Sequence, residues 1–145
     1  MSGAAEIHSF RHQAMNTEFA IYVSGESESY AGGVCAQAFS DLDLLENELS
    51  RFKDSSDISR INRLDSGQEI DIGLAAYDCL MLAKDLWEET HGAFDITIGP
   101  LFHIWRSSTG EPLEPGEALV AATRGATGMD KLVIHEDRPR AGVTI

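Results

Sequence analysis

The stretch HGAFDITIGPLFHIW, residues 91–105, marks the point where a helical pattern ends and a loop rich in glycine and proline follows. It places Asp95 and Thr97 inside an apolar run. In one interpretation, the Asp95 carboxylate accepts backbone N–H groups in a turn and organises the loop. In the other interpretation, the small residues Gly92, Ala93 and Gly99 form a thin wall of a binding site, so that a flat ligand or its phosphates approach the main chain. Asp95 and Thr97 then supply hydrogen bonds to this ligand. Spacing alone favours the first interpretation, and both fit the same residues.

Two segments before this stretch show helical periodicity. Residues 74–92 predict a helix that Gly92 ends as a C-cap residue. Residues 30–49 predict a longer helix with acids opposite an apolar stripe. The stripe consists of Cys35, Ala38, Phe39, Leu42, Leu45 and Leu49.

The segment between these helices, residues 50–67, is polar and rich in serine and aspartate. Ser56 or Asp57 is placed to cap a short helical turn through Ile58 and Ile61. The polarity of the segment predicts an exposed connection.

Short β-prone segments complete the pattern. SFRHQAM and EFAIYV open the chain, EIDIG follows the polar segment, and KLVIHE and AGVTI close the chain as a hairpin. A further helix is predicted from Glu117 to about Ala126, ending near Gly128. The fold class is therefore predicted to be α+β, with a sheet of mixed short strands and helices packed against it.

The closing strand is predicted to stop at the last residue. It would then leave main-chain hydrogen-bonding groups that a following segment or a partner chain would satisfy. We therefore expect the front part of a longer protein, and an exposed terminal strand would favour self-association into a homo-oligomer.

Composition limits the partners. The 145 residues, of which 43% are hydrophobic, predict one folded unit, residues 1–145. The formal charge of −13 disfavours nucleic acid and anionic lipid surfaces as partners. The first 17 residues show neither a signal peptide nor a membrane segment. We expect a cytoplasmic protein, or a periplasmic or membrane-anchored one if a leader has been removed, and Cys35 and Cys79 are expected to be free, buried thiols.

Few residues suggest chemistry by themselves. The five histidines are scattered, so no metal site is predicted, and the common phosphate-loop and zinc motifs are absent. Met15 and Thr17 would begin a strand, with Met15 in the core. Phe52 and Trp105 would each be a core plug or a stacking surface for a planar ligand, and packing is favoured for Trp105.

Four blocks, in this order, resemble the ApbE family, the FAD:protein FMN transferases. They are AMNT (14–17), LENELSRFKDSSDISRIN (45–62), HGAFDITIGPLFHIW (91–105) and GMDKLVI (128–134). The resemblance runs from Met15 to the last residue, and one departure is Asn16, where the family usually has glycine.

The resemblance implies the N-terminal part of an ApbE-like fold that handles flavin. Members of the family cleave FAD with magnesium and transfer FMN to a threonine hydroxyl of an acceptor flavoprotein, and some hydrolyse FAD to FMN and AMP. By resemblance, FAD is the substrate and the site residues are Met15, Phe52, Ala93, Phe94 and Asp95. Arg51, Asp57, Ser59 and Asn62 would shape the adjoining loop.

The resemblance also implies an absence. The family's D-L-G-[GA]-[IV]-[AG]-K-G motif and its magnesium-binding aspartate and threonine, which would follow a strand like AGVTI, are not among these residues. Phosphoryl transfer depends on positioning and on a metal that neutralises charge. We therefore expect part of a flavin site, with no metal site in this chain; the alternative is a non-catalytic flavin-binding or protein-interaction module of the same fold.

Overall fold

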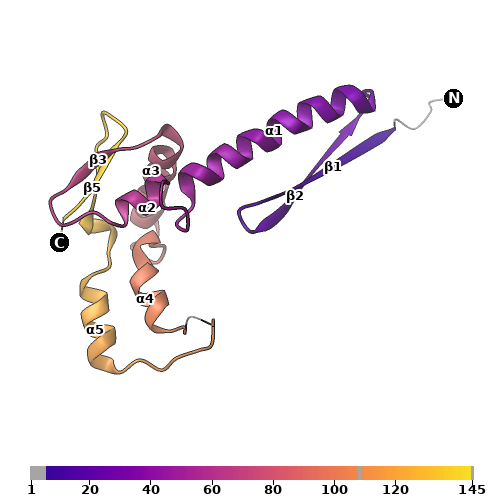
Figure 1. The fold of residues 1–145 in the computed structure, drawn as a ribbon. Helices are drawn as coiled ribbons and strands as arrows, with labels where there is room; N and C mark the ends of the chain where they lie inside the picture. Colours follow the sequence, from indigo (N-terminus) through magenta and orange to yellow (C-terminus); the bar gives the residue numbers. More distant parts are fainter. Residues whose placement is uncertain (1–5, 108, 145) are drawn as a thin grey trace. The chain divides into compact units, whose positions relative to one another are not determined.

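The computed structural model describes residues 6–107 and 109–144, and the chain divides between Ser59 and Arg60 into two compact units. The first unit contains a β-hairpin and a long helix, and the second contains short strands and several helices (Figure 1). The predicted α+β class is confirmed, with the strands arranged in two small antiparallel sheets. That the chain forms a single region of a longer fold stays a prediction.

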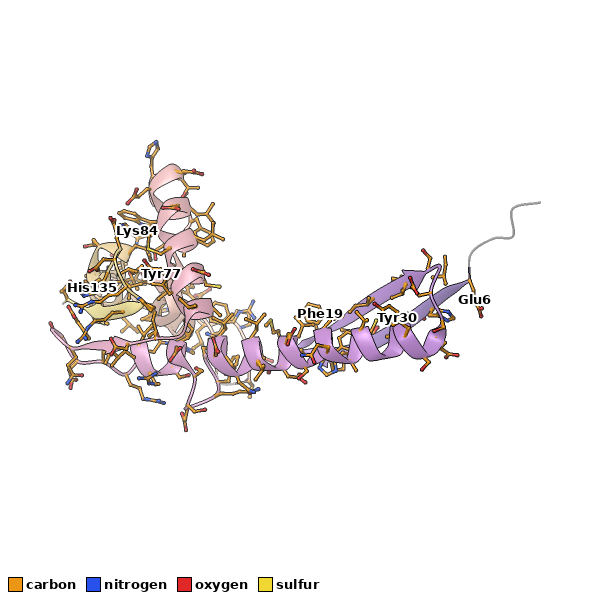
Figure 2. The ribbon with its side chains drawn as sticks, turned by 90° about the horizontal axis from the view of Figure 1, so that it is seen from above. Glu6, Phe19, Tyr30, Tyr77, Lys84 and His135 are labelled. Carbon is orange, nitrogen blue, oxygen red and sulfur yellow. The ribbon has the colours of Figure 1, made fainter. Side chains whose placement is uncertain are left out.

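The first unit is a hairpin packed along a helix. Strands β1 (Ile7–Ala14) and β2 (Thr17–Ser24) pair antiparallel, in a register that ends with Ala14 opposite Thr17. Helix α1 (Glu28–Leu49) begins where the Ser27 side chain accepts the Tyr30 N–H at 3.3 Å. Phe19 on β2 and Tyr30 on α1 lie where the hairpin and the helix run side by side (Figure 2).

Small side chains and stacked rings fill the interface between hairpin and helix. Ala31 and Cys35 are buried on α1, and the His12 ring stacks on Phe39 with 4.9 Å between ring centroids. The predicted apolar stripe is correct for Cys35 and Phe39. It is wrong in placing all acids opposite, because Asp43 bonds to His12 at 2.8 Å and Glu46 bonds to the hairpin turn.

The polar segment after α1 is more buried than predicted. Ser56 caps α2 (Asp57–Ile61) by accepting the Ser59 N–H at 3.0 Å. The Ser56 and Ser59 hydroxyls both donate to the Ser50 carbonyl. Ser56, Asp57 and Ser59 are buried, so the expectation of an exposed connection was wrong for this part.

The second unit contains a three-stranded antiparallel sheet in the order β3 (Glu69–Asp71), β5 (Arg140–Val143) and β4 (Leu132–Ile134). The predicted closing hairpin is confirmed. Its last described strand, β5, lies in the centre of the sheet, however, and not at an exposed edge. The reason given for self-association was therefore wrong, because neighbouring strands already pair with β5 on both sides; the oligomeric state stays a prediction.

Helix α3 (Leu74–Glu89) is tied to the turn between β4 and β5. The Tyr77 hydroxyl donates to the Glu136 carbonyl at 3.1 Å, and Lys84 Nζ lies 3.0 Å from the Glu136 carboxylate. This ion pair raises the pKa of Lys84. Figure 2 shows Tyr77 and Lys84 close to His135, the residue before Glu136 in the sequence.

Helix α3 ends in a Schellman motif. The His91 N–H donates to the Glu88 carbonyl at 3.1 Å, and the Gly92 N–H donates to the Trp87 carbonyl at 2.8 Å. His91 occupies the left-handed position directly after the cap residue Thr90, with φ 51°. The position directly after the cap residue, where a glycine was expected, is therefore occupied by His91, and Gly92 follows one residue later.

The remaining elements of the second unit are short. They are η1 (Ile96–Ile98), α4 (Gly99–Ile104), α5 (Glu117–Gly125) and η2 (Met129–Lys131). Both cysteines are free, but Cys79 is exposed, which corrects the expectation that both thiols are buried. Among the described residues, no helix has the length and apolar character needed to cross a membrane.

Gly142, in the centre of β5, leaves no room for a side chain. A Cβ atom there would lie 2.6 Å from the Gln68 carbonyl oxygen and 2.5 Å from Glu69 Cγ. We expect Gly142→Ala to lower the free energy of unfolding by about 1–3 kcal/mol, because the neighbouring strand must shift. Urea unfolding followed by circular dichroism measures this. Gly125→Ala, with nothing within 4 Å of the new Cβ, is the control, and equal stability of the two variants would contradict the close approach.

Glu69 on β3 is predicted to make stability depend on pH. Burial raises the pKa of Glu69, but a hydrogen bond from Arg140 at 2.9 Å and the nearby His135 imidazole, whose Nε2 lies 3.1 Å from the carboxylate, outweigh this and lower the pKa below 4.5. Because the pKa of Glu69 is lowered, the ionised side chain stabilises the fold at pH values above its unfolded-state pKa. This stabilisation is lost as the pH falls through the folded-state pKa. The difference in urea midpoint between wild type and Glu69→Gln should therefore be present at neutral pH and vanish in acid. A difference in urea midpoint that persists in acid, or an equal difference for Glu114→Gln at an exposed position, would contradict this role of Glu69.

Candidate functional site

Asp95 is the organising residue of the turn between α3 and η1. Its Oδ1 accepts the Thr97 N–H at 2.7 Å and the Thr97 hydroxyl at 2.6 Å, so Asp95 caps η1. This confirms the interpretation in which the carboxylate organises the loop. Both bonds use one oxygen, and among the described residues none donates to the other oxygen, Oδ2.

Thr97 joins two sequence blocks that lie far apart in the chain. Its Oγ1 donates to Asp95 and accepts the Gly128 N–H at 2.7 Å. Gly128 has φ 137°, which side-chain-bearing residues rarely adopt, and an added Cβ would collide with the Asp130 carboxylate. The chain Asp95–Thr97–Gly128 therefore holds residues 91–105 against residues 128–134.

The main-chain donors before Asp95 are already used. The Ala93 N–H donates to the Thr90 carbonyl at 3.1 Å, and the Phe94 N–H donates to the Thr90 hydroxyl at 3.0 Å. Thr90 was not identified from the sequence, although its place in the last turn of the helix was visible. Ala93 and Phe94 therefore offer carbonyl oxygens and an exposed phenyl ring instead of N–H groups.

Met15 lies in the turn between β1 and β2, not at the start of a strand or in the core as predicted from the residues alone. Met15 and Asn16 have φ 51° and 60°, and the Met15 side chain is 41% exposed. A long side chain such as that of Met15 is strained in this left-handed region, and such strain clusters at functional sites. The predicted strand residue Thr17 does begin β2.

Phe52 is 82% exposed, so it is not a core plug. Its N–H donates to the Ser50 hydroxyl at 3.3 Å, and the Arg51 guanidinium lies 4.6 Å from the centre of its ring. Of the other residues expected to shape this loop, Ser59 does so through Ser50, whereas Asn62 is exposed.

The structure brings the candidate residues together in two groups. Ala93, Phe94 and Asp95 form one continuous turn in the second unit, whereas Met15 and Phe52 belong to the first. Glu46 links the segments that carry Met15 and Phe52. This role could not be predicted, because Glu46 lies on the helix face that was expected to meet solvent. Within residues 6–107 and 109–144, no three or more His, Cys, Asp or Glu side chains gather in a way that could hold a metal ion.

Curated relatives carry the name FAD:protein FMN transferase. The protein of Klebsiella pneumoniae strain 342 is 29% identical over 124 residues, covering 84% of this chain and 35% of that protein. The protein of Escherichia coli K12 is 24% identical over 133 residues, covering 90% of this chain and 38% of that protein. The chain thus spans less than two fifths of the length of these relatives.

Solved structures show the same fold. The apo form of the flavinyl transferase ApbE of Pseudomonas stutzeri aligns with a TM-score of 0.80 and 21% identity, covering 99% of this chain and 46% of that one. The flavin transferase ApbE of Vibrio cholerae aligns with a TM-score of 0.80 and 23% identity, covering 96% of this chain and 45% of that one. The ApbE family itself matches residues 15–145, which is most of the sequence. This chain therefore belongs to the ApbE family.

Proposed function

We propose that this chain is part of a protein that transfers FMN from FAD to an acceptor flavoprotein, and that it contributes part of the FAD site. The names of its relatives support the activity. The observation that carries the proposal for this chain is the Asp95–Thr97–Gly128 hydrogen-bond chain, which fixes the Asp95 carboxylate through one of its oxygens and joins the family-like blocks 91–105 and 128–134.

Each unit contributes residues to FAD binding in this proposal: the second unit contributes Ala93, Phe94 and Asp95, and the first contributes Met15 and Phe52. The turn at residues 93–95 offers acceptors, because the N–H groups of Ala93 and Phe94 already bond to Thr90. Acceptors suit the hydrogen-bond donors of FAD, which are the isoalloxazine N3–H, the sugar hydroxyls and the adenine amino group. The phosphates carry no donors, and a chain of charge −13 repels them. We therefore assign this turn to a donor-bearing part of FAD and not to its pyrophosphate.

Met15 and Phe52 supply apolar surface in the first unit. An exposed phenyl ring can stack on a planar ring system, and a thioether adapts to its edge. Both side chains are at least 41% exposed and therefore accessible to a ligand.

Magnesium and a threonine hydroxyl of the acceptor complete the proposed reaction. A magnesium ion would neutralise phosphate charge, and it prefers several oxygen ligands in near-octahedral geometry. Within residues 6–107 and 109–144, no three or more His, Cys, Asp or Glu side chains gather in a way that could hold a metal ion, and this proposal assigns these residues no metal-dependent step. Their role is to bind and orient FAD.

A second candidate function is a protein-interaction module of the same fold. Large apolar side chains between residues 94 and 105 are 41–50% exposed, and such a concentration is typical of interaction surfaces. They are Phe94, Ile96, Ile98, Phe102 and Trp105. This candidate predicts a protein partner and no affinity for FAD.

Titration of FAD into the 145-residue chain separates the two functions. We expect saturable quenching of flavin fluorescence. Asp95→Asn should weaken binding roughly tenfold or more, because it keeps an oxygen that can accept the Thr97 N–H but removes the charge that strengthens bonds to a ligand. Thr97→Val should weaken binding by releasing the link to Gly128, and exposed Glu114→Gln should bind like wild type. The absence of saturable binding by the wild-type chain would refute the proposed FAD site.

Chromatography of the same mixtures with magnesium tests the partial-site proposal. We expect neither AMP nor FMN to be released, because the magnesium-binding aspartate and threonine that the resemblance implies are not among these residues. Release of AMP that depends on magnesium would show that these residues hold the ion, and would overturn this part of the proposal.

A further inference from the structure

The turn between β1 and β2 is held in a costly conformation. Ala14 and Thr17 are directly paired, so Met15 and Asn16 alone must reverse the chain, and both have positive φ. This is the geometry of a type I′ turn, which favours Asn and Gly. Asn16 suits it, but a long side chain in the left-handed region is strained. Another contact is therefore expected to hold the Met15 backbone.

Glu46 on α1 supplies that contact. Its Oε2 accepts the Met15 N–H at 3.1 Å. In a two-residue hairpin turn the N–H of the first turn residue bonds to neither strand, so this carboxylate satisfies a donor that the sheet leaves open. The contact also lies on the hairpin side of α1, in line with Phe39 and Asp43, which contact His12.

The second oxygen of the same carboxylate reaches the segment that carries Phe52. Glu46 Oε1 lies 3.3 Å from Lys53 Nζ, and this ammonium also donates to Asn47 Oδ1 at 2.8 Å. Lys53 directly follows Phe52, and the Lys53 carbonyl accepts the Ser56 N–H at 3.0 Å. One carboxylate thus connects the Met15 turn to the loop of Phe52, with all partners in the first unit.

We propose that Glu46 is a positioning residue, which fixes Met15 and the Phe52 loop in one arrangement for the flavin. The consequence for the ligand rests on the proposed function, but the arrangement itself does not. Pre-organised groups lose less conformational freedom on binding, so loss of Glu46 weakens binding without removing any atom that contacts the ligand.

The charge of Glu46 is favoured by its surroundings. The Met15 N–H, and after it the Lys53 ammonium, lower the pKa of Glu46 below 4.5, whereas Asp43 acts in the opposite direction. Asp43 is itself paired with His12 on β1. Because the pKa is lowered, the link is complete at neutral pH and is lost as the pH falls through the folded-state pKa.

The test uses the Met15 amide in the full 145-residue chain, observed by NMR without ligand. An N–H that donates to a carboxylate shifts when the carboxylate is protonated. We expect the Met15 amide shift to titrate with a midpoint below 4.5 in wild type and in Glu48→Gln, a matched change on the same helix, and not to titrate in Glu46→Gln. A Met15 amide that is insensitive to pH in wild type would overturn the inference, even if Glu46→Gln failed to fold.

FAD titrations at neutral pH test the consequence. Glu46→Gln should bind roughly fivefold more weakly, the effect of about one net hydrogen bond, and Glu48→Gln should bind like wild type. Lys53→Gln should keep the Met15 amide titration but weaken binding, since it breaks only the link to the Phe52 loop. Equal affinity of Glu46→Gln and wild type would overturn the positioning role. If wild type itself does not bind FAD, the proposed function fails, and the amide titration still decides whether Glu46 holds the turn.

Discussion

The most completely buried side chains of the described residues are small, and a few directional contacts add to the geometry that packing provides. Cys35 and Ser56 are the largest side chains buried almost completely. The hydrophobic effect is non-directional, whereas a hydrogen bond between fixed groups has a preferred distance and angle. A few polar groups therefore contribute to the relative placement of neighbouring segments within each unit. In the first unit they include the Glu46 carboxylate, and in the second the Thr97 hydroxyl.

Both groups satisfy main-chain donors that regular secondary structure leaves open. Glu46 accepts from a hairpin turn, and Thr97 accepts from Gly128 before a short 3-10 helix. Each contact therefore stabilises a bend as well as joining two segments. The main-chain donors in these turns are already used for folding, and the candidate ligand-facing groups are therefore acceptors.

Periodic parts of the fold could be predicted from the sequence, because amphipathic spacing reports directly on burial. The strands, α1, α3 and the closing hairpin follow from it. The role of Asp95 could also be predicted, since an aspartate between apolar residues in a turn bonds its own backbone. Positions set by tertiary contacts could not: Met15 is no usual turn residue, His91 takes the left-handed position ahead of a glycine, and Glu46 contacts the hairpin from a face expected to meet solvent. In these cases the neighbouring segment, and not the local pattern, determines the conformation.

The central place of β5 in its sheet has a consequence for synthesis. Strands β3 and β4 each pair with β5 and not with each other, and β5 comes last in the chain order. When β3 and β4 have left the ribosome during synthesis, β5, the strand with which both of them pair, has therefore not yet been made. The hairpin and α1, whose contacts are close in sequence, can form while the rest of the chain is still being made. The second sheet must wait for its last strand, and until then the backbone groups of β3 are open to pairing with other chains.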